Sequence, residues 1–122
     1  MRKKNIISIL LIATILSGMS VVNAFADTTL IETNSGTHTF NSRWTGQTIS
    51  KNNSTLSYGF DTTLINEDYA YANSIGYRHR SKIKNGNGLH YGPKKWANDG
   101  RSDIEVRHKG SKIYYYCMNV TS

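Results

Sequence analysis

Turn-forming residues recur at short intervals after residue 26, and this spacing leaves room only for short structural segments. Asn and Gly cluster at residues 34–36, 52–53, 85–88, 98–100 and 109–110. The segments between the turns are rich in Thr, Tyr, Ile and Ser, and none repeats apolar residues with a helical period. Such composition is typical of a sandwich or small barrel. We therefore expect residues 27–122 to form a single all-β domain, a small antiparallel β-sandwich.

These turns also predict how the strands pair. We expect three hairpins, formed by segments 28–32 with 37–40, 47–50 with 54–60, and 104–108 with 112–120. Segment 64–72 is the one ambiguous piece, because it could hold a single helical turn before the next strand.

Segment 69–84 is the longest run without a turn signal. Side chains alternate between the two faces of a strand. One face would bury the residues Tyr69, Tyr71, Asn73, Ile75, Tyr77, His79, Ser81 and Ile83. The opposite face would hold Arg78, Arg80, Lys82 and Lys84 in solvent, since a shift of one residue would bury four charges. A bend near residues 74–76 is expected, because sixteen residues is long for one strand.

Residues 1–26 have the three parts of a secretory signal peptide. Arg2, Lys3 and Lys4 are followed by the apolar run 6–15, and Ala24-Phe25-Ala26 matches a signal-peptidase site. A second candidate site ends at Ala24. The apolar run is too short for a membrane-spanning helix, which needs roughly 20 apolar residues. We expect cleavage and release of the protein outside the cell.

Removal of the signal peptide lowers the net charge and leaves it unevenly distributed. The whole chain has 15 Lys and Arg and eight Asp and Glu, and residues 27–122 keep twelve of these cations and all eight acids. Residues 27–76 have a net charge of −3, whereas residues 77–122 have +7. Cys117 is the only cysteine, so no internal disulfide can form. We expect Cys117 to be a buried core residue, with an intermolecular disulfide or a reactive thiol as alternatives.

The basic half contains the candidate binding residues. Alternate residues of a strand are roughly 6.5–7 Å apart, so the four cations at 78–84 form a row that could meet repeating phosphate groups. The expected ligand-binding residues are Arg78, Arg80, Lys82, Lys84, Lys94, Lys95 and Trp96. The expected partner is an anionic cell-envelope component or membrane surface, not a nucleic acid. The alternative is that the row is only a solvated face or a charged edge that prevents aggregation.

Other kinds of site find less support in the sequence. The eight Tyr and two Trp could stack on sugars, so an adhesion or carbohydrate-binding module is the alternative function. The four His show no metal-ligand spacing, and neither a phosphate-binding loop nor a G-x-S-x-G motif is present. We expect no cofactor, no metal and no enzymatic activity, although separated acids could in principle form a glycosidase pair.

Three short motifs suggest a family. Residues 77–86 read Tyr-Arg-His-Arg-Ser-Lys-Ile-Lys-Asn-Gly, followed by Lys95-Trp96-Ala97 and by Ile113-Tyr114-Tyr115-Tyr116. This part resembles the lactococcin-type unmodified bacteriocins, while residues 27–68 have no counterpart there. The resemblance implies a secreted β-sandwich that inhibits septum formation by binding the lipid-linked cell-wall precursor. It transfers no functional residues. The expected function is a secreted, non-enzymatic, bacteriocin-like protein that acts on the cell envelope.

Overall fold

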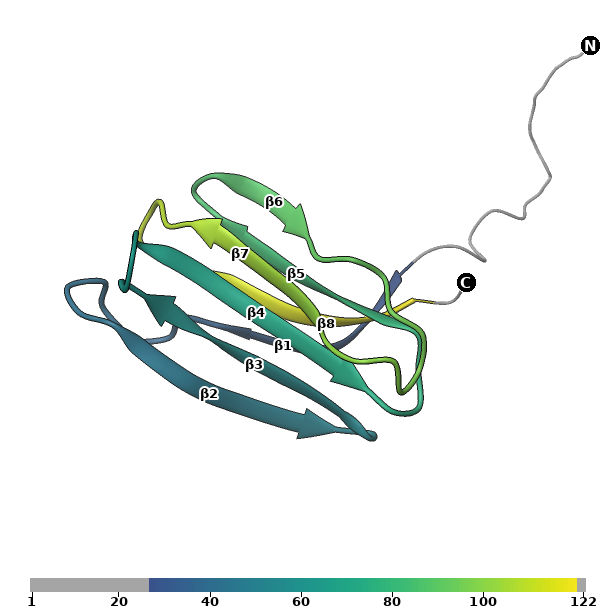
Figure 1. The fold of residues 1–122 in the computed structure, drawn as a ribbon. Helices are drawn as coiled ribbons and strands as arrows, with labels where there is room; N and C mark the ends of the chain where they lie inside the picture. The colour runs from purple at the N-terminus through teal and green to yellow at the C-terminus, as the bar shows by residue number, and fades with distance from the viewer. Residues whose placement is uncertain (1–26, 121–122) are drawn as a thin grey trace, which may run out of the picture.

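The computed structural model describes residues 27–120 as two antiparallel four-stranded sheets that pack face to face (Figure 1). One sheet has the strand order β1-β8-β5-β6 and the other β2-β3-β4-β7. The strands are β1 (Asp27–Asn34), β2 (Trp44–Lys51), β3 (Ser54–Asp61), β4 (Glu67–Ser74), β5 (His79–Asn85), β6 (Gly88–Tyr91), β7 (Ser102–Arg107) and β8 (Tyr114–Val120). The predicted all-β, antiparallel fold is therefore confirmed. The signal peptide predicted at residues 1–26 lies outside the described residues.

Only one of the three predicted hairpins forms. β2 and β3 pair through the turn at Asn52 and Asn53, whose φ angles of 50° and 60° are those of a tight hairpin turn. Two further hairpins, which were not predicted, join β3 to β4 and β5 to β6. The turn at residues 34–36 does not begin a hairpin, because β1 pairs with β8 and residues 37–40 form no strand.

The predicted last hairpin is also wrong. β7 pairs with β4 in one sheet, whereas β8 lies between β1 and β5 in the other. The turn at residues 108–113 therefore leads the chain from one sheet to the other. The ambiguous segment 64–72 contains no helical turn, since residues 62–66 form a loop and β4 begins at Glu67.

The long run 69–84 is divided between the two sheets. The predicted bend near residues 74–76 is where the chain leaves β4 and crosses to β5. This crossing exposes Ile75 and Tyr77, which were predicted to lie in the core and are instead 60% and 38% exposed. The inward and outward pattern of side chains on β4 therefore does not continue into β5, and each strand has its own alternation.

On β4 the predicted faces are reversed. Ala70 and Ala72 point into the core, and Tyr69 and Tyr71 stack together on the outer face with ring centres 4.7 Å apart. The Tyr69 hydroxyl accepts a hydrogen bond from the Gly46 amide at 2.9 Å, and the Tyr71 hydroxyl donates to Glu105 at 2.8 Å. Small alanines fit at the core positions because large side chains from the facing sheet fill the space.

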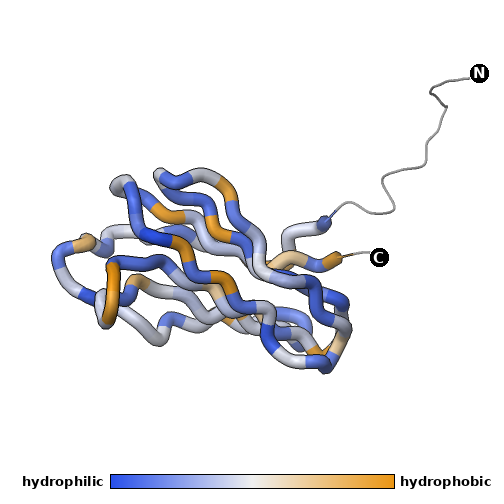
Figure 2. The backbone as a smooth tube through the Cα atoms, turned by 45° about the horizontal axis from the view of Figure 1, so that its top comes forward, coloured by the Kyte–Doolittle hydropathy of each residue, from blue (hydrophilic) through white to orange (hydrophobic). Residues whose placement is uncertain are grey.

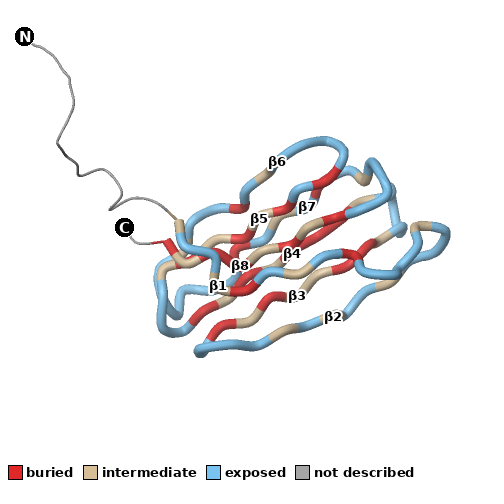
Figure 3. Tube along the Cα trace, turned by 180° about the vertical axis from the view of Figure 1, so that it is seen from behind, coloured by how far each residue is buried: buried red, intermediate tan, exposed pale blue. Residues whose placement is uncertain are grey.

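The core lies between the sheets and is centred on β8, β5 and β3. Its largest buried side chains include Tyr115, Phe60, Leu56, Ile83 and Ile113. Cys117 is fully buried and unpaired, as predicted. Hydrophobic and hydrophilic segments interleave along the strands (Figure 2), and buried segments run through the middle strands while β2, β6 and the end loops are mainly exposed (Figure 3). Within residues 27–120 no helix is long and apolar enough to cross a membrane.

Candidate functional site

The cation row, defined as Arg78, Arg80, Lys82 and Lys84, lies along β5 and the residue before it. His79, Ser81 and Ile83 alternate with these cations and are fully buried, so the cations point away from the core. Arg78, Arg80 and Lys82 are half-buried and Lys84 is exposed. The predicted orientation of this segment is therefore correct for β5, although the strand is shorter than expected.

Aromatic rings from neighbouring strands flank the row on both sides. In the β5–β8 and β5–β6 registers, Lys82 lies opposite both Tyr116 and Tyr91. Its ammonium nitrogen is 4.3 Å from the centre of the Tyr116 ring and 5.8 Å from that of Tyr91. The Arg80 guanidinium lies 4.0 Å over the Tyr91 ring. A ring face holds a cation in place, with roughly 0.5–1 kcal/mol at exposed sites, but does not cancel its charge.

Arg80 differs from the other cations because it also has a carboxylate partner. Its Nε donates to an Asp27 carboxylate oxygen at 2.7 Å, and its Nη2 forms an ion pair with the same oxygen. Arg80 thereby connects the first residue of β1 to β5 across β8. Its charge is largely matched, so Arg80 contributes less to the positive potential of the face than Arg78, Lys82 and Lys84.

Arg78 and Trp96 form one unit although they are 18 positions apart. The guanidinium carbon of Arg78 lies 4.3 Å from the centre of the Trp96 ring. Trp96 remains 65% exposed, since only one side of its ring is covered. Arg78 Nε is buried and has no hydrogen-bond partner among residues 27–120. An unpartnered buried donor costs about 1–3 kcal/mol. The contacts that hold this guanidinium in place therefore have to offset that free energy.

The two predicted lysines, Lys94 and Lys95, both lie in the loop 92–101. Lys94 is exposed in this loop. Lys95 pairs with His79 through two backbone hydrogen bonds of 2.8 and 2.9 Å. Residues directly opposite in an antiparallel bridge project to the same side, so Lys95 points to the side of the buried His79 ring and away from the row. Trp96, the next residue, points toward Arg78.

The outer faces of the two sheets differ in charge. The face of the β1-β8-β5-β6 sheet has the cation row, with Asp27 and Glu32 as its acids. The opposite face, on β3, β4 and β7, has the acids Asp61, Glu67, Asp103 and Glu105. Arg107 is the cation of these three strands. Arg101, which directly precedes β7, pairs with Asp103 at 2.9 Å. This separation places the positive potential on one side of the sandwich.

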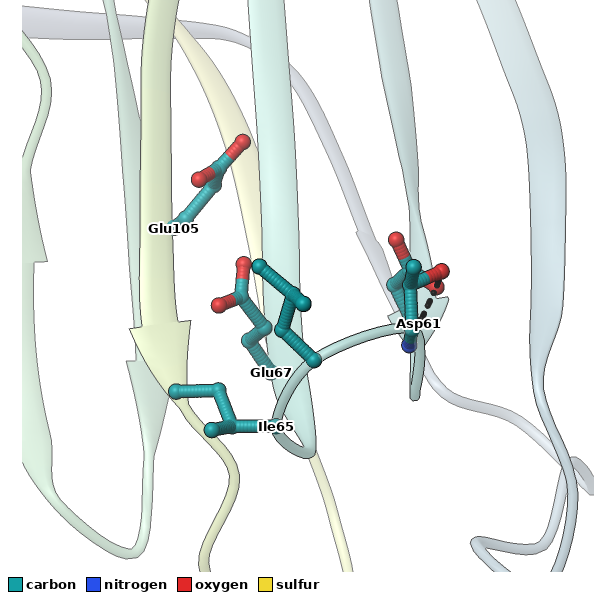
Figure 4. Close-up of a pocket in the computed structure, with 6 residues that line it drawn as sticks. Asp61, Ile65, Glu67 and Glu105 are labelled. Carbon is teal, nitrogen blue, oxygen red and sulfur yellow. Dashed lines mark hydrogen bonds between the residues drawn. The ribbon is translucent and has the colours of Figure 1, made fainter.

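A shallow hollow of about 270 Å³ lies on the acidic side, at the end of the sandwich where β4 begins (Figure 4). It is lined by Asp61, Thr63, Leu64, Ile65, Glu67 and Glu105. Partial burial, together with the neighbouring charges of Glu105 and Asp61, raises the pKa of Glu67. No group of three or more His, Cys, Asp or Glu within residues 27–120 is arranged to hold a metal ion. We assign no function to this hollow.

Two further polar groups are buried and hold elements together. Asp68 accepts hydrogen bonds from Asn85 Nδ2 at 2.7 Å and lies 3.0 Å from His108 Nδ1. Burial raises the pKa of Asp68, and these two partners counteract part of that rise. Ser81 and Ser102 hydroxyls lie 3.2 Å apart across the sheets. These contacts are structural, since all of the groups involved are buried or half-buried.

Comparison of the chain with protein-family models, with curated proteins and with solved structures found no match in any of the three. The site therefore has to be interpreted from its own geometry.

The sequence analysis missed the partners that organise the row. Tyr91, Tyr116 and Asp27 were not among the predicted binding residues, yet each contacts a cation of the row. Alternation along a strand places Tyr115 on one face and Tyr114 and Tyr116 on the other. It could not show which strand they would face, because β8 lies beside β5 only through long-range pairing.

Proposed function

We propose that the protein is a secreted, non-enzymatic binding protein that acts in bacteriocin fashion on an anionic component of the cell envelope. The cation row is the proposed binding surface. Phosphate-bearing wall polymers, lipid headgroups and the lipid-linked cell-wall precursor share the chemistry that this surface would recognise.

The observation that supports this proposal is the way in which the cations are held. Three of the four contact aromatic rings, and only Arg80 also contacts a carboxylate. Rings restrict the motion of the side chains without neutralising them, so less ordering is needed when an anion binds. A merely solvated face would not need this arrangement.

The same contacts favour an anion over a sugar as the ligand. A sugar would have to stack on a ring face, and cations already lie over the faces of Tyr91 and Tyr116. Trp96 is the exception, with one ring face exposed. The carbohydrate-binding alternative therefore depends mainly on Trp96 and is an outcome that the experiment below can detect.

The energetics require both charges and rings. A cation near an anionic surface contributes about 1 kcal/mol, so the three cations without a carboxylate partner contribute roughly 3 kcal/mol. That free energy alone corresponds to a dissociation constant of about 6 mM. Micromolar binding would need further contacts from the aromatic side chains.

The test compares two quadruple variants with the same change in charge. R78Q/R80Q/K82Q/K84Q removes the row, and R43Q/K51Q/R107Q/K109Q removes four exposed cations elsewhere. Binding is measured to vesicles that contain phosphatidylglycerol and to isolated Gram-positive cell walls, and growth inhibition of Gram-positive strains is scored in parallel. We expect the row variant to bind more than about tenfold more weakly and the control variant less than about threefold.

Three results would count against the proposal. Equal losses in both variants would mean that only net charge matters. Unchanged binding in the folded row variant would mean that the row is a solvated face. Binding that resists an increase from about 0.05 M to about 0.5 M salt but is lost in W96A would favour sugar stacking. Secretion is tested separately by mass spectrometry of culture supernatant, where we expect an N-terminus at Asp27 or Phe25.

A further inference from the structure

Three large apolar side chains are exposed together at one end of the sandwich. Ile75 and Tyr77 lie in the crossing from β4 to β5, and Trp96 lies in the loop between β6 and β7, with exposures of 60%, 38% and 65%. We call these three residues the tip. Figure 1 shows the two loops side by side at the end where β4 finishes, and a 2.8 Å hydrogen bond from the Asn98 amide to the Ser74 carbonyl joins them. Exposed apolar groups gathered in this way indicate an interaction surface.

Buried hydrogen bonds hold the tip in position. His79 lies beneath both loops, with Nδ1 2.9 Å from the Tyr77 carbonyl oxygen and Nε2 2.8 Å from the Gly100 carbonyl oxygen. The Ile75 amide donates to the Asn53 carbonyl at 3.1 Å, which anchors the crossing to the β2–β3 turn. A surface that is already ordered loses little conformational entropy on binding.

The charges around the tip are mainly positive. Arg78 stacks on Trp96, and the loop 92–101 adds Lys94 and Lys95 against the acid Asp99, while Arg101 is paired with Asp103. The opposite end of the sandwich also exposes apolar residues, Leu64 and Ile65, but these line the hollow with Asp61, Glu67 and Glu105. Leu89 and Tyr91 on the edge strand β6 are also exposed beside Lys84 and Lys82, but they lie along the side of the sheet. Of the two ends, the acids of the hollow offset the cations at one, whereas the tip combines apolar side chains with a positive surrounding.

We infer that the tip docks on a lipid bilayer with anionic headgroups and inserts Ile75, Tyr77 and Trp96 into the interfacial region. Trp and Tyr favour this region because they have an apolar body and a polar edge, while nearby cations attract the headgroups. The inference rests on the proposed function and deepens it, because it identifies the anionic envelope component as a membrane surface and fixes the orientation of the protein.

This orientation makes the four cations of the row unequal. β5 runs away from the tip, so Lys84 lies about 20 Å farther along the strand than Arg78. The screening length at physiological salt is about 8 Å, so a headgroup layer at the tip would attract Arg78 strongly and Lys84 hardly at all. We expect R78Q to weaken vesicle binding about fivefold and K84Q to leave it unchanged. Docking through the whole sheet face would make the two losses similar.

The experiment uses Trp96 as its reporter. The chain has two tryptophans, Trp44 and Trp96, so W44F leaves Trp96 alone. Vesicles of phosphatidylglycerol and phosphatidylcholine, with and without brominated acyl chains, are added to the W44F protein. We expect a blue shift of the Trp96 emission and quenching by the brominated lipid. I75S/Y77S should bind about ten- to a hundredfold more weakly, while the matched variant L64S/I65S at the opposite end should bind normally.

A second reporter covers the case in which W44F does not fold. Cys117 is fully buried, so a Cys introduced as I75C can be labelled selectively with an environment-sensitive fluorophore. Vesicle binding without a spectral change at position 75 or 96 would overturn the tip inference and leave the proposed function standing. Binding to cell walls but not to vesicles would do the same. If neither walls nor vesicles are bound, the proposed function fails as well.

Discussion

The Nε2 atom of His79 lies 2.8 Å from the carbonyl oxygen of Gly100, although 21 positions separate the two residues. The other ring nitrogen faces the Tyr77 carbonyl oxygen, and the side chain is fully buried. One side chain therefore lies between two loop carbonyls that belong to different connections, and the nitrogen that has the hydrogen donates to one of them. His79 fixes the relative positions of the crossing 75–78 and the loop 92–101.

From this contact we expect H79A to lower the free energy of unfolding by about 2–4 kcal/mol, because it removes the hydrogen bond that the ring donates to a loop carbonyl and creates a cavity. It should also make the loop 92–101 more sensitive to proteolysis. Urea unfolding and limited proteolysis measure the two effects. H90A is the control, since half-buried His90 contacts only the Asn87 carbonyl in the β5–β6 turn, and it should cost well under about 1 kcal/mol. A similar loss in both variants would contradict this role of His79.

Gly92 and Gly76 should respond differently to substitution by alanine. A Cβ atom on Gly92 would overlap the Ser81 hydroxyl and would lie 2.7 Å from the Ser102 hydroxyl and 3.0 Å from the Asp103 carbonyl oxygen. Overpacking of this kind costs about 1–3 kcal/mol. A Cβ atom on Gly76 would have its nearest neighbour at 4.0 Å, so G76A should change stability by less than about 0.5 kcal/mol. Thermal unfolding of both variants tests the difference, and equal effects would refute the packing described around Gly92.

Cys117 should be unreactive in the folded protein. Its side chain is fully buried, and burial raises the pKa of the thiol from 9.0 to about 11. A pKa that is two units higher leaves roughly a hundredfold less thiolate at pH 8. Burial of the sulfur slows the approach of the reagent further. We expect a thiol reagent to label the native protein at least about a hundredfold more slowly than the protein in denaturant. Rapid labelling of the native protein would instead favour the disulfide or reactive-thiol alternative.

The raised pKa of Glu67 predicts a pH-dependent effect on stability. The folded protein holds the Glu67 proton more tightly than the unfolded chain does. The stabilisation from this residue is therefore complete at low pH and is lost as pH rises from the usual value of 4.5 through the raised value. E67Q should stabilise the protein at pH 7 by roughly 0.2–1 kcal/mol, because it removes a partly buried negative charge and its repulsion by Glu105 and Asp61.

Urea unfolding at pH 7 and at about pH 4 measures this effect, and the gain from E67Q should vanish at the lower pH, where Glu67 is protonated. E32Q, on the exposed side of β1, is a control that lies outside the hollow. If E67Q destabilised the protein at pH 7, neither the partial burial of the Glu67 charge nor its repulsion by the other acids would be the dominant effect.

Local signals in the sequence predicted what is decided locally. The hairpin at Asn52 and Asn53 forms because these two residues accept positive φ angles between two alternating segments. The outward direction of Arg80, Lys82 and Lys84 follows from the cost of burying charge, which permits only one register for β5.

Pairing between distant strands could not be predicted in the same way. Ile31 pairs with Cys117, and no turn signal or periodicity relates residues so far apart. The absence of any signal for distant contacts also explains the error on β4, where Tyr69 and Tyr71 were predicted to face the core. Both side chains lie on the outer side of β4, where Tyr69 is nevertheless buried, because Ala70 and Ala72 take the core positions in the cluster with Tyr115 of the facing sheet. The tyrosine hydroxyls find partners on the outer face.

The position of β8 between β1 and β5 has a consequence for when the chain can fold. Residues 114–120 form the interior strand β8, which is the last strand in the chain. β1 and β5 therefore lack their shared partner until β8 has been synthesised. Tyr115 and Cys117 of the core arrive with the same strand. A chain that emerges from its N-terminus would therefore stay open until its last strand has appeared. Such late closure through distant contacts is slow, and it would keep the chain unfolded for longer during the secretion that we propose.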